Sequence, residues 1–85
     1  MRLRVITPAA VCVDRNVSRI VAEAPNGFFG MLPNHIDFVT QLVPGILVFE
    51  PEGSGTDRFV AINSGTLVKC GEDVRVAVRG AMEGD

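Results

Sequence analysis

The sequence has 85 residues, enough for one small domain with a thin stability margin, since a chain of this size buries roughly 60–65% of its unfolded surface. Hydrophobic residues make up 47% of the chain, with no Trp or Tyr and only five Phe, so the core must consist mainly of Val, Ile, Leu and Ala, and β-branched residues at this density favour strands. The net charge of −2, with charges scattered singly, argues against the clustered Lys and Arg of a nucleic-acid-binding surface.

The first third of the chain predicts three short strands separated by turns. Alternation of polar and apolar residues indicates the first strand, with Leu3 and Val5 inward, and β-branched residues favour strands in the other two. A tight turn is expected at 14–16, between the second and third strands. The expected strands are Arg2–Ile6, Ala10–Asp14 and Val17–Ala24.

The stretch from Asn26 to Phe49 combines turn-forming residues, apolar residues and the only histidine. Turn signals at 25–27, 33–34 and 44–45 exclude a long helix and predict short strands joined by ordered corners. Pro44-Gly45 fits the central positions of a type II turn, in which glycine supplies a positive φ. Residues 46–49 form a continuous apolar run, which is expected in a strand covered on both faces.

The last third predicts a flexible hairpin loop at 50–57 and three strands, at Arg58–Ile62, Thr66–Cys70 and Val74–Arg79. Residues 80–85 carry no pattern and are expected to fray. Roughly eight to ten short strands without a helical period predict an all-β fold, an antiparallel β-sandwich or flattened barrel. The expected organisation is one β-sandwich domain at 1–80 and a frayed tail at 81–85.

Catalytic groups are scarce: the chain has one histidine, no tyrosine and two separated cysteines. His35 and Asp37 would share one face of a strand and could form a His–carboxylate pair, but histidine is also common at polar corners. No recognised metal-ligand spacing and no phosphate-binding glycine motif occurs. We therefore expect a protein that is not an enzyme, with no catalytic residue, no cofactor and no metal site.

The cysteines and the single lysine have ordinary structural interpretations. Cys12 and Cys70 lie in strand-like runs without CxxC spacing, so we expect buried thiols, with a disulfide as the less favoured alternative. Lys69 lacks the flanking residues of a lysine that carries a covalent modification in small carrier domains, and it is expected to face solvent.

No targeting or membrane-spanning segment is apparent in the sequence. No apolar run approaches the ~20 residues of a membrane span, and the opening residues MRLRVITP alternate charged with apolar side chains, unlike a signal peptide. We therefore expect a soluble chain that stays in the compartment where it is made.

The apolar corner at 28–39 is the candidate contact surface for another protein. Three of its residues, Pro33, Asn34 and His35, are turn-forming or polar and are expected at an outward tip. The larger apolar side chains are interpreted as core residues: Phe29, Leu32, Ile36 and Phe38.

Three landmarks in the correct order resemble the epsilon subunit of the F-type rotary ATP synthase. They are NGFFGMLPNH at 26–35, PGIL at 44–47 and FVAINSGT at 59–66, and MRLRVITP matches the opening strand. The usual pattern has a turn of the form G-x-F/L-G-x-L-P-G-H, then a Pro-Gly before a strand, then a strand ending in S-G-G. The resemblance extends over essentially all 85 residues.

The resemblance implies an amino-terminal β-sandwich at the foot of the rotating central stalk. In that family the sandwich binds the gamma subunit along one side, and its turn-rich end touches the loops of the membrane-embedded c-ring. The implied function is a non-catalytic rotor subunit that couples proton or sodium flow to ATP synthesis, peripheral to the cytoplasmic face of the bacterial plasma membrane. The ring-facing corner then falls on Gly27, Phe28, Gly30, Pro33, Asn34 and His35.

The alternative interpretation is an unrelated β-sandwich adaptor whose apolar corner binds another protein. The presence or absence of the other synthase subunits' genes beside this one would separate the two.

Several residues depart from the usual family pattern. Phe28 stands where an acidic residue is common, so an apolar contact would replace an ion pair with the ring. Asn34 replaces a glycine, which is a mild change because Asn tolerates left-handed backbone. The run His35–Val39 stands where H-A-P-L-L is usual and indicates a divergent branch. Most relatives continue into two carboxy-terminal helices that inhibit hydrolysis, so we expect a rotor-coupling subunit without inhibitory helices.

Overall fold

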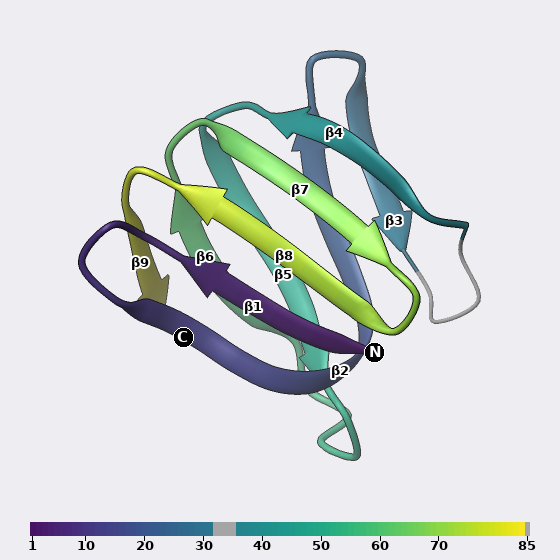
Figure 1. The fold of residues 1–85 in the computed structure, drawn as a ribbon. Coiled ribbons are helices and arrows are strands. Elements are labelled where there is room, and N and C mark those ends of the chain that lie inside the picture. The colour runs from purple at the N-terminus through teal and green to yellow at the C-terminus, as the bar shows by residue number, and fades with distance from the viewer. Residues whose placement is uncertain (32–35, 85) are drawn as a thin grey trace.

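The computed structural model describes residues 1–31 and 36–84, and this part of the chain is built entirely of strands, turns and corners. None of the described residues lies in a helix of the length and apolar character needed to cross a membrane. The strands form two layers, one in front of the other in Figure 1. In chain order they are β1 (Arg2–Ile6), β2 (Val11–Ala24), β3 (Gly27–Met31), β4 (Phe38–Leu42), β5 (Gly45–Pro51), β6 (Arg58–Ile62), β7 (Gly65–Cys70), β8 (Asp73–Val78) and β9 (Ala81–Gly84).

Strand β2 belongs to both layers. Its 14 residues would span roughly 46 Å if straight, whereas the longest dimension of the molecule is 28 Å, so the strand must bend. An irregularity in its pairing with β5, between Val17 and Arg19, marks the bend. Before the bend β2 pairs with β1, and after it β2 pairs with β5 and β3. In Figure 1, β2 follows the lower edge beneath β1 and then turns up behind β7 and β8.

The tight turn expected at 14–16 is therefore wrong. Asp14 and Asn16 lie opposite Arg4 and Arg2 in the antiparallel pairing with β1, so the chain stays extended through the predicted turn. Turn-forming residues favour a turn only where no partner strand competes, and here the cross-strand hydrogen bonds of β1 outweigh that local preference.

The front layer, sheet A, contains β4, β7, β8, β1 and the first half of β2, in that order. The rear layer, sheet B, contains the second half of β2 with β3 on one side and β5, β6 and β9 on the other. β1 and β8 pair in parallel, and the other described strand pairs are antiparallel. The predicted all-β sandwich is confirmed, and its two layers are joined through the backbone of β2.

The core lies between the two layers and consists mainly of aliphatic side chains, as the composition predicts. Alternation places Leu3 and Val5 inward, both with no exposed surface, and the three valines of β8 are buried in the same way. Phe49 is the largest fully buried side chain. Burying a side chain of this kind contributes about 1.5–3 kcal/mol, so a small set of such residues carries most of the stability.

The corner at Pro44-Gly45 is present, but it is not the type II turn that the dipeptide predicts. Gly45 is the first residue of β5, and its φ is not among the positive ones. A Cβ atom on Gly45 would lie 3.0 Å from Glu23 Oε1, so the glycine makes room for the Glu23 side chain. The Val43 amide donates to the Glu23 carbonyl at 3.1 Å, which fastens the corner to β2.

Two further expectations about single strands are wrong. Ile46 is 48% exposed although Leu47 and Phe49 are buried, so β5 is covered on one face and open on the other. Residues 81–84 do not fray, because they pair with Phe59–Ile62 of β6. Those backbone hydrogen bonds give the segment an order that its side-chain pattern does not reveal.

Candidate partner-binding surfaces

The β2–β3 hairpin presents the described part of the predicted ring-facing corner. Gly27 has a φ of 121°, which L side chains rarely adopt, so the turn into β3 requires glycine. Phe28 is 71% exposed and Gly30 is also exposed, and both point away from the core. Three residues of the corner, Pro33, Asn34 and His35, lie outside the described residues, so their contact role and the His35–Asp37 pairing remain predictions.

An aromatic pair closes the base of this corner. The rings of Phe29 and Phe38 meet edge to face, with centroids 5.9 Å apart and planes at 76°, and both pack against the core, as predicted. The core role expected of Ile36 is wrong, since its side chain is 77% exposed. Ile36 precedes β4, whose pairing with β7 begins at Phe38, so it is not inserted between the sheets. Leu32 is outside the described residues.

Lys69 is buried, against the expectation that it faces solvent. Its side chain is 2% exposed because Lys69 shares the inward side of β7 with Leu67. Its Nζ donates to the Gly71 carbonyl at 2.8 Å and lies 3.8 Å from Asp37 Oδ1. The same Asp37 oxygen accepts a hydrogen bond from the Gly71 amide at 2.8 Å. The alternation with Leu67 was the available sequence signal for this burial.

The outer side of sheet B carries exposed apolar side chains in neighbouring rows. Ile46, Ala61 and Met82 lie opposite one another across β5, β6 and β9, and Val48 lies opposite Phe59 in the next row. Met82 is 75% exposed, and Ile46 and Phe59 are 48% and 40% exposed. We call these five residues the apolar face. An uninterrupted apolar group of this kind on a small domain indicates a contact surface.

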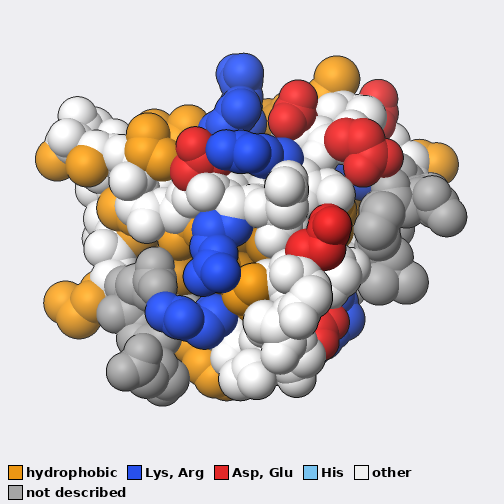
Figure 2. Space-filling view, turned by 90° about the horizontal axis from the view of Figure 1, so that it is seen from below, with side chains coloured by type: hydrophobic (Ala, Val, Ile, Leu, Met, Phe, Trp, Pro, Cys, Tyr) orange, Lys and Arg blue, Asp and Glu red, His pale blue; other side chains and the backbone are white. Residues whose placement is uncertain are grey.

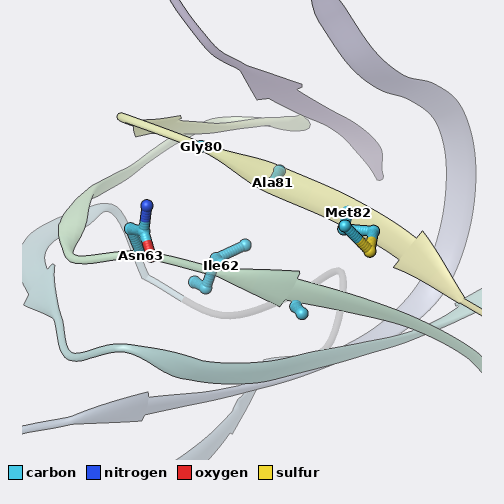
Figure 3. Close-up of a pocket in the computed structure, with 6 residues that line it drawn as sticks. Ile62, Asn63, Gly80, Ala81 and Met82 are labelled. Carbon is cyan, nitrogen blue, oxygen red and sulfur yellow. The ribbon is translucent and has the colours of Figure 1, made fainter.

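A hollow lies at one end of the apolar face, between β6 and β9. Its volume is about 420 Å³, and it is open to solvent. Figure 3 shows Asn63 and Gly80 at one end of the hollow and Met82 at the other. The backbone N–H of Asn63 donates to the Gly80 carbonyl at 3.1 Å. Sequence reasoning missed this region, because it assigned β9 to a frayed tail and read residues 46–49 as covered on both sides.

The outer side of sheet A differs, because charged side chains line its β1, β2 and β8 strands, while β4 and β7 carry the exposed valines Val39 and Val68. We call Arg2, Arg4, Asp14, Asp73 and Arg75 the charged face. Arg2 Nε donates to Asp14 Oδ1 at 2.7 Å, and Arg4 Nε lies 3.7 Å from the same oxygen. The Arg2 hydrogen bond holds the pKa of Asp14 below its usual value, and the same bond raises the pKa of Arg2. Seen from below, basic side chains form a broken band across the molecule, with acidic ones mostly to one side (Figure 2).

Both cysteines are free thiols, but they are less buried than expected. Cys12 is half-buried, and Cys70 is exposed because it lies on the outward side of β7 with Val68. Within residues 1–31 and 36–84, no three His, Cys, Asp or Glu side chains gather in a group that could hold a metal ion.

Residues 1–84 match the family model described as ATP synthase, Delta/Epsilon chain, beta-sandwich domain. The whole chain aligns at 39% identity with ATP synthase epsilon chain 2 of Paraburkholderia xenovorans and at 42% with ATP synthase epsilon chain 2 of Cereibacter sphaeroides. It spans only 62% and 59% of the lengths of those two relatives.

Solved structures show the same fold. The fold matches a chain of the mitochondrial ATP synthase OSCP/F1/c-ring assembly of Euglena gracilis, with a TM-score of 0.87 and 26% identity over 95% of this chain and 51% of that one. A chain of the Tetrahymena thermophila ATP synthase central stalk and c-ring matches with a TM-score of 0.81 over 96% of this chain and 65% of that one; at 16% identity, this likeness concerns the fold alone.

Proposed function

Because this chain belongs to the family of the ATP synthase delta/epsilon chain β-sandwich domain, we propose that it is a non-catalytic central-stalk subunit of an F-type ATP synthase. In this role it links the gamma subunit to the c-ring and couples proton or sodium flow to ATP synthesis, at the cytoplasmic face of the bacterial plasma membrane. The observation that carries the proposal is the likeness of 95% of the chain to part of an F1/c-ring assembly.

The gamma subunit is assigned to the apolar face of sheet B. A lasting contact between two subunits needs a largely apolar centre, and Ile46, Phe59 and Met82 offer one. The charged face is a poorer candidate, because its Arg2–Asp14 and Arg4–Asp14 pairs would lose solvent on contact without gaining new partners.

The c-ring is assigned to the corner formed by Gly27, Phe28 and Gly30 together with residues 33–35. The Phe28 ring stands free of the core at 71% exposure, so it is available for contact. The described part of the corner lies on β3 and the apolar face lies on β5, β6 and β9, and these different strands of sheet B would allow one domain to touch two partners at once.

Co-purification with a whole synthase tests this function. The tagged chain, expressed with the other synthase subunits, should recover gamma and the c-ring together. Phe28→Ala should keep gamma and lower ATP synthesis in membrane vesicles, because it removes an exposed ring from the corner. Val11→Ala is the matched control, since Val11 is 56% exposed on β2 and lies outside both surfaces. A chain that stays alone, in cells whose synthase assembles normally without it, would contradict the proposal.

A further inference from the structure

The one lysine of this chain is buried where an alternating strand would place an aliphatic residue. Lys69 follows Leu67 on the inward side of β7, and its side chain is 2% exposed. Lysine is almost never fully buried unless it is paired, because the ammonium group loses its hydration. The groups that contact its Nζ atom are therefore the ones that the buried charge can position.

Three groups close a ring of contacts around this charge. Lys69 Nζ donates to the Gly71 carbonyl at 2.8 Å and lies 3.8 Å from Asp37 Oδ1. The Gly71 amide donates to the same Asp37 oxygen at 2.8 Å. Gly71 has a φ of 60°, the left-handed conformation that suits glycine at the β7–β8 turn. We call Asp37, Lys69 and Gly71 the latch.

The latch lies beside the chain that leads away from the predicted ring-facing corner. Asp37 immediately precedes β4, so the latch ties the start of this strand to the β7–β8 turn. On the other side of residues 32–35, Met31 is buried with no exposed surface, and the Phe29–Phe38 ring pair joins the two sides. The described residues on both sides of 32–35 are therefore held against the sandwich.

We propose that Lys69 is a positioning residue, which acts through Asp37 and Gly71 to fix the base of the corner relative to sheet A. A purely stabilising role would not require a charge, because an apolar side chain of similar size in place of a buried ion pair is often neutral or stabilising. The ion pair instead specifies one arrangement of Asp37 against the turn.

The latch is tested first in the isolated full chain, by amide hydrogen exchange. Asp37→Ala removes the acceptor of the Gly71 amide, which should then exchange about tenfold faster, the loss expected for one hydrogen bond of ordinary strength. Lys69→Met should accelerate the same amide while the amides of β8 keep their protection. Arg79→Met is the matched control, because it removes a positive charge from an exposed residue after β8 and should leave Gly71 unchanged.

The double variant Lys69→Met/Asp37→Ala decides whether the two side chains act together. If they form one latch, the double variant exchanges at Gly71 no faster than the faster single variant. Additive effects, or unchanged exchange at Gly71 in Asp37→Ala, would overturn the latch. Should Lys69→Met not fold, Lys69→Arg takes its place, because it keeps the positive charge, and unchanged Gly71 exchange in Asp37→Ala still overturns the latch, since Asp37 is 64% exposed on its side chain and contributes little to the core.

The positioning role rests on the proposed c-ring contact and is tested in the reconstituted synthase. Asp37→Ala should assemble normally and hydrolyse ATP at the wild-type rate, yet pump severalfold fewer ions per ATP. Normal pumping by a variant whose Gly71 exchange is accelerated would overturn the positioning role. Failure of the wild-type chain to join the synthase would instead overturn the proposed function, while the exchange measurements still judge the latch.

Discussion

The two outer faces of this sandwich are built by the same strand alternation, yet they present opposite chemistry. On sheet A the outward positions of β1 and β8 carry Arg2, Arg4 and Arg75, and Asp14 of β2 pairs with both Arg2 and Arg4. On sheet B the outward positions of β5, β6 and β9 carry Ile46, Ala61 and Met82 in one row. An antiparallel sheet needs only one buried face, so an apolar outward face signals a second contact. The difference is the reason for proposing sheet B as the side that meets another protein.

Loss of a central core side chain should abolish both faces at once. Phe49→Ala removes the largest fully buried side chain, from between the two faces, and should cost about 3–5 kcal/mol. A domain of this size has little more stability than that, so both faces should be lost together. Urea unfolding measures the loss. Phe28→Ala, at an exposed ring, should change stability by less than about 0.5 kcal/mol. Equal losses for the two phenylalanines would contradict the assigned core.

A carboxylate placed on the outer side of one sheet and then of the other should affect gamma binding differently. Ile46→Glu sets a carboxylate at the centre of the apolar face and should weaken gamma binding by about thirtyfold or more, as expected for a central contact residue. Val68→Glu is the matched control, because Val68 is an exposed valine on the outer side of sheet A, beside Arg75. Titration calorimetry with purified gamma gives both affinities. Stronger damage from Val68→Glu would move the gamma contact to sheet A.

The smallest effect concerns the charged face alone. The Arg2 hydrogen bond lowers the pKa of Asp14 in the folded chain, so on acidification the unfolded chain binds a proton at Asp14 first. The stabilisation by this pair is therefore complete above about pH 4 and is lost as the pH falls through the lowered pKa. Thermal unfolding of wild type and Asp14→Asn should differ slightly at neutral pH and converge in acid. A difference between the two chains that stays the same in acid would contradict this role of the pair.

The sequence predicted this fold well where the residue pattern within a single strand is enough to identify that strand. The valines of β8 alternate cleanly, and all three are buried. The prediction failed where pairing with another strand determines whether a segment is extended. Residues 14–16 contain turn-forming residues but pair with β1, and residues 81–84 have no pattern but pair with β6. Local preferences contribute a few tenths of a kcal/mol per residue, and a ladder of cross-strand hydrogen bonds outweighs them.

The candidate sites divide in the same way. The outward position of Phe28 was implied by the family resemblance and not by the strand pattern, and the structure leaves its side chain exposed on β3. The apolar face could not be found, because its rows form only when β5, β6 and β9 lie side by side. Lys69 required both the strand alternation and the knowledge that Asp37, 32 positions earlier, lies within reach of its Nζ atom.

The bend of β2 gives this small domain a particular mechanical behaviour. Because one continuous strand pairs with β1 before the bend and with β5 after it, a force applied to sheet B reaches sheet A along a covalent backbone. If only side-chain packing joined the two layers, they could slide past each other. Because β2 is shared, sliding would load its backbone hydrogen bonds to β1 and to β5 in shear at the same time. A rotor part that is pulled on one side and resisted on the other would behave as one stiff body, with little twist stored inside it.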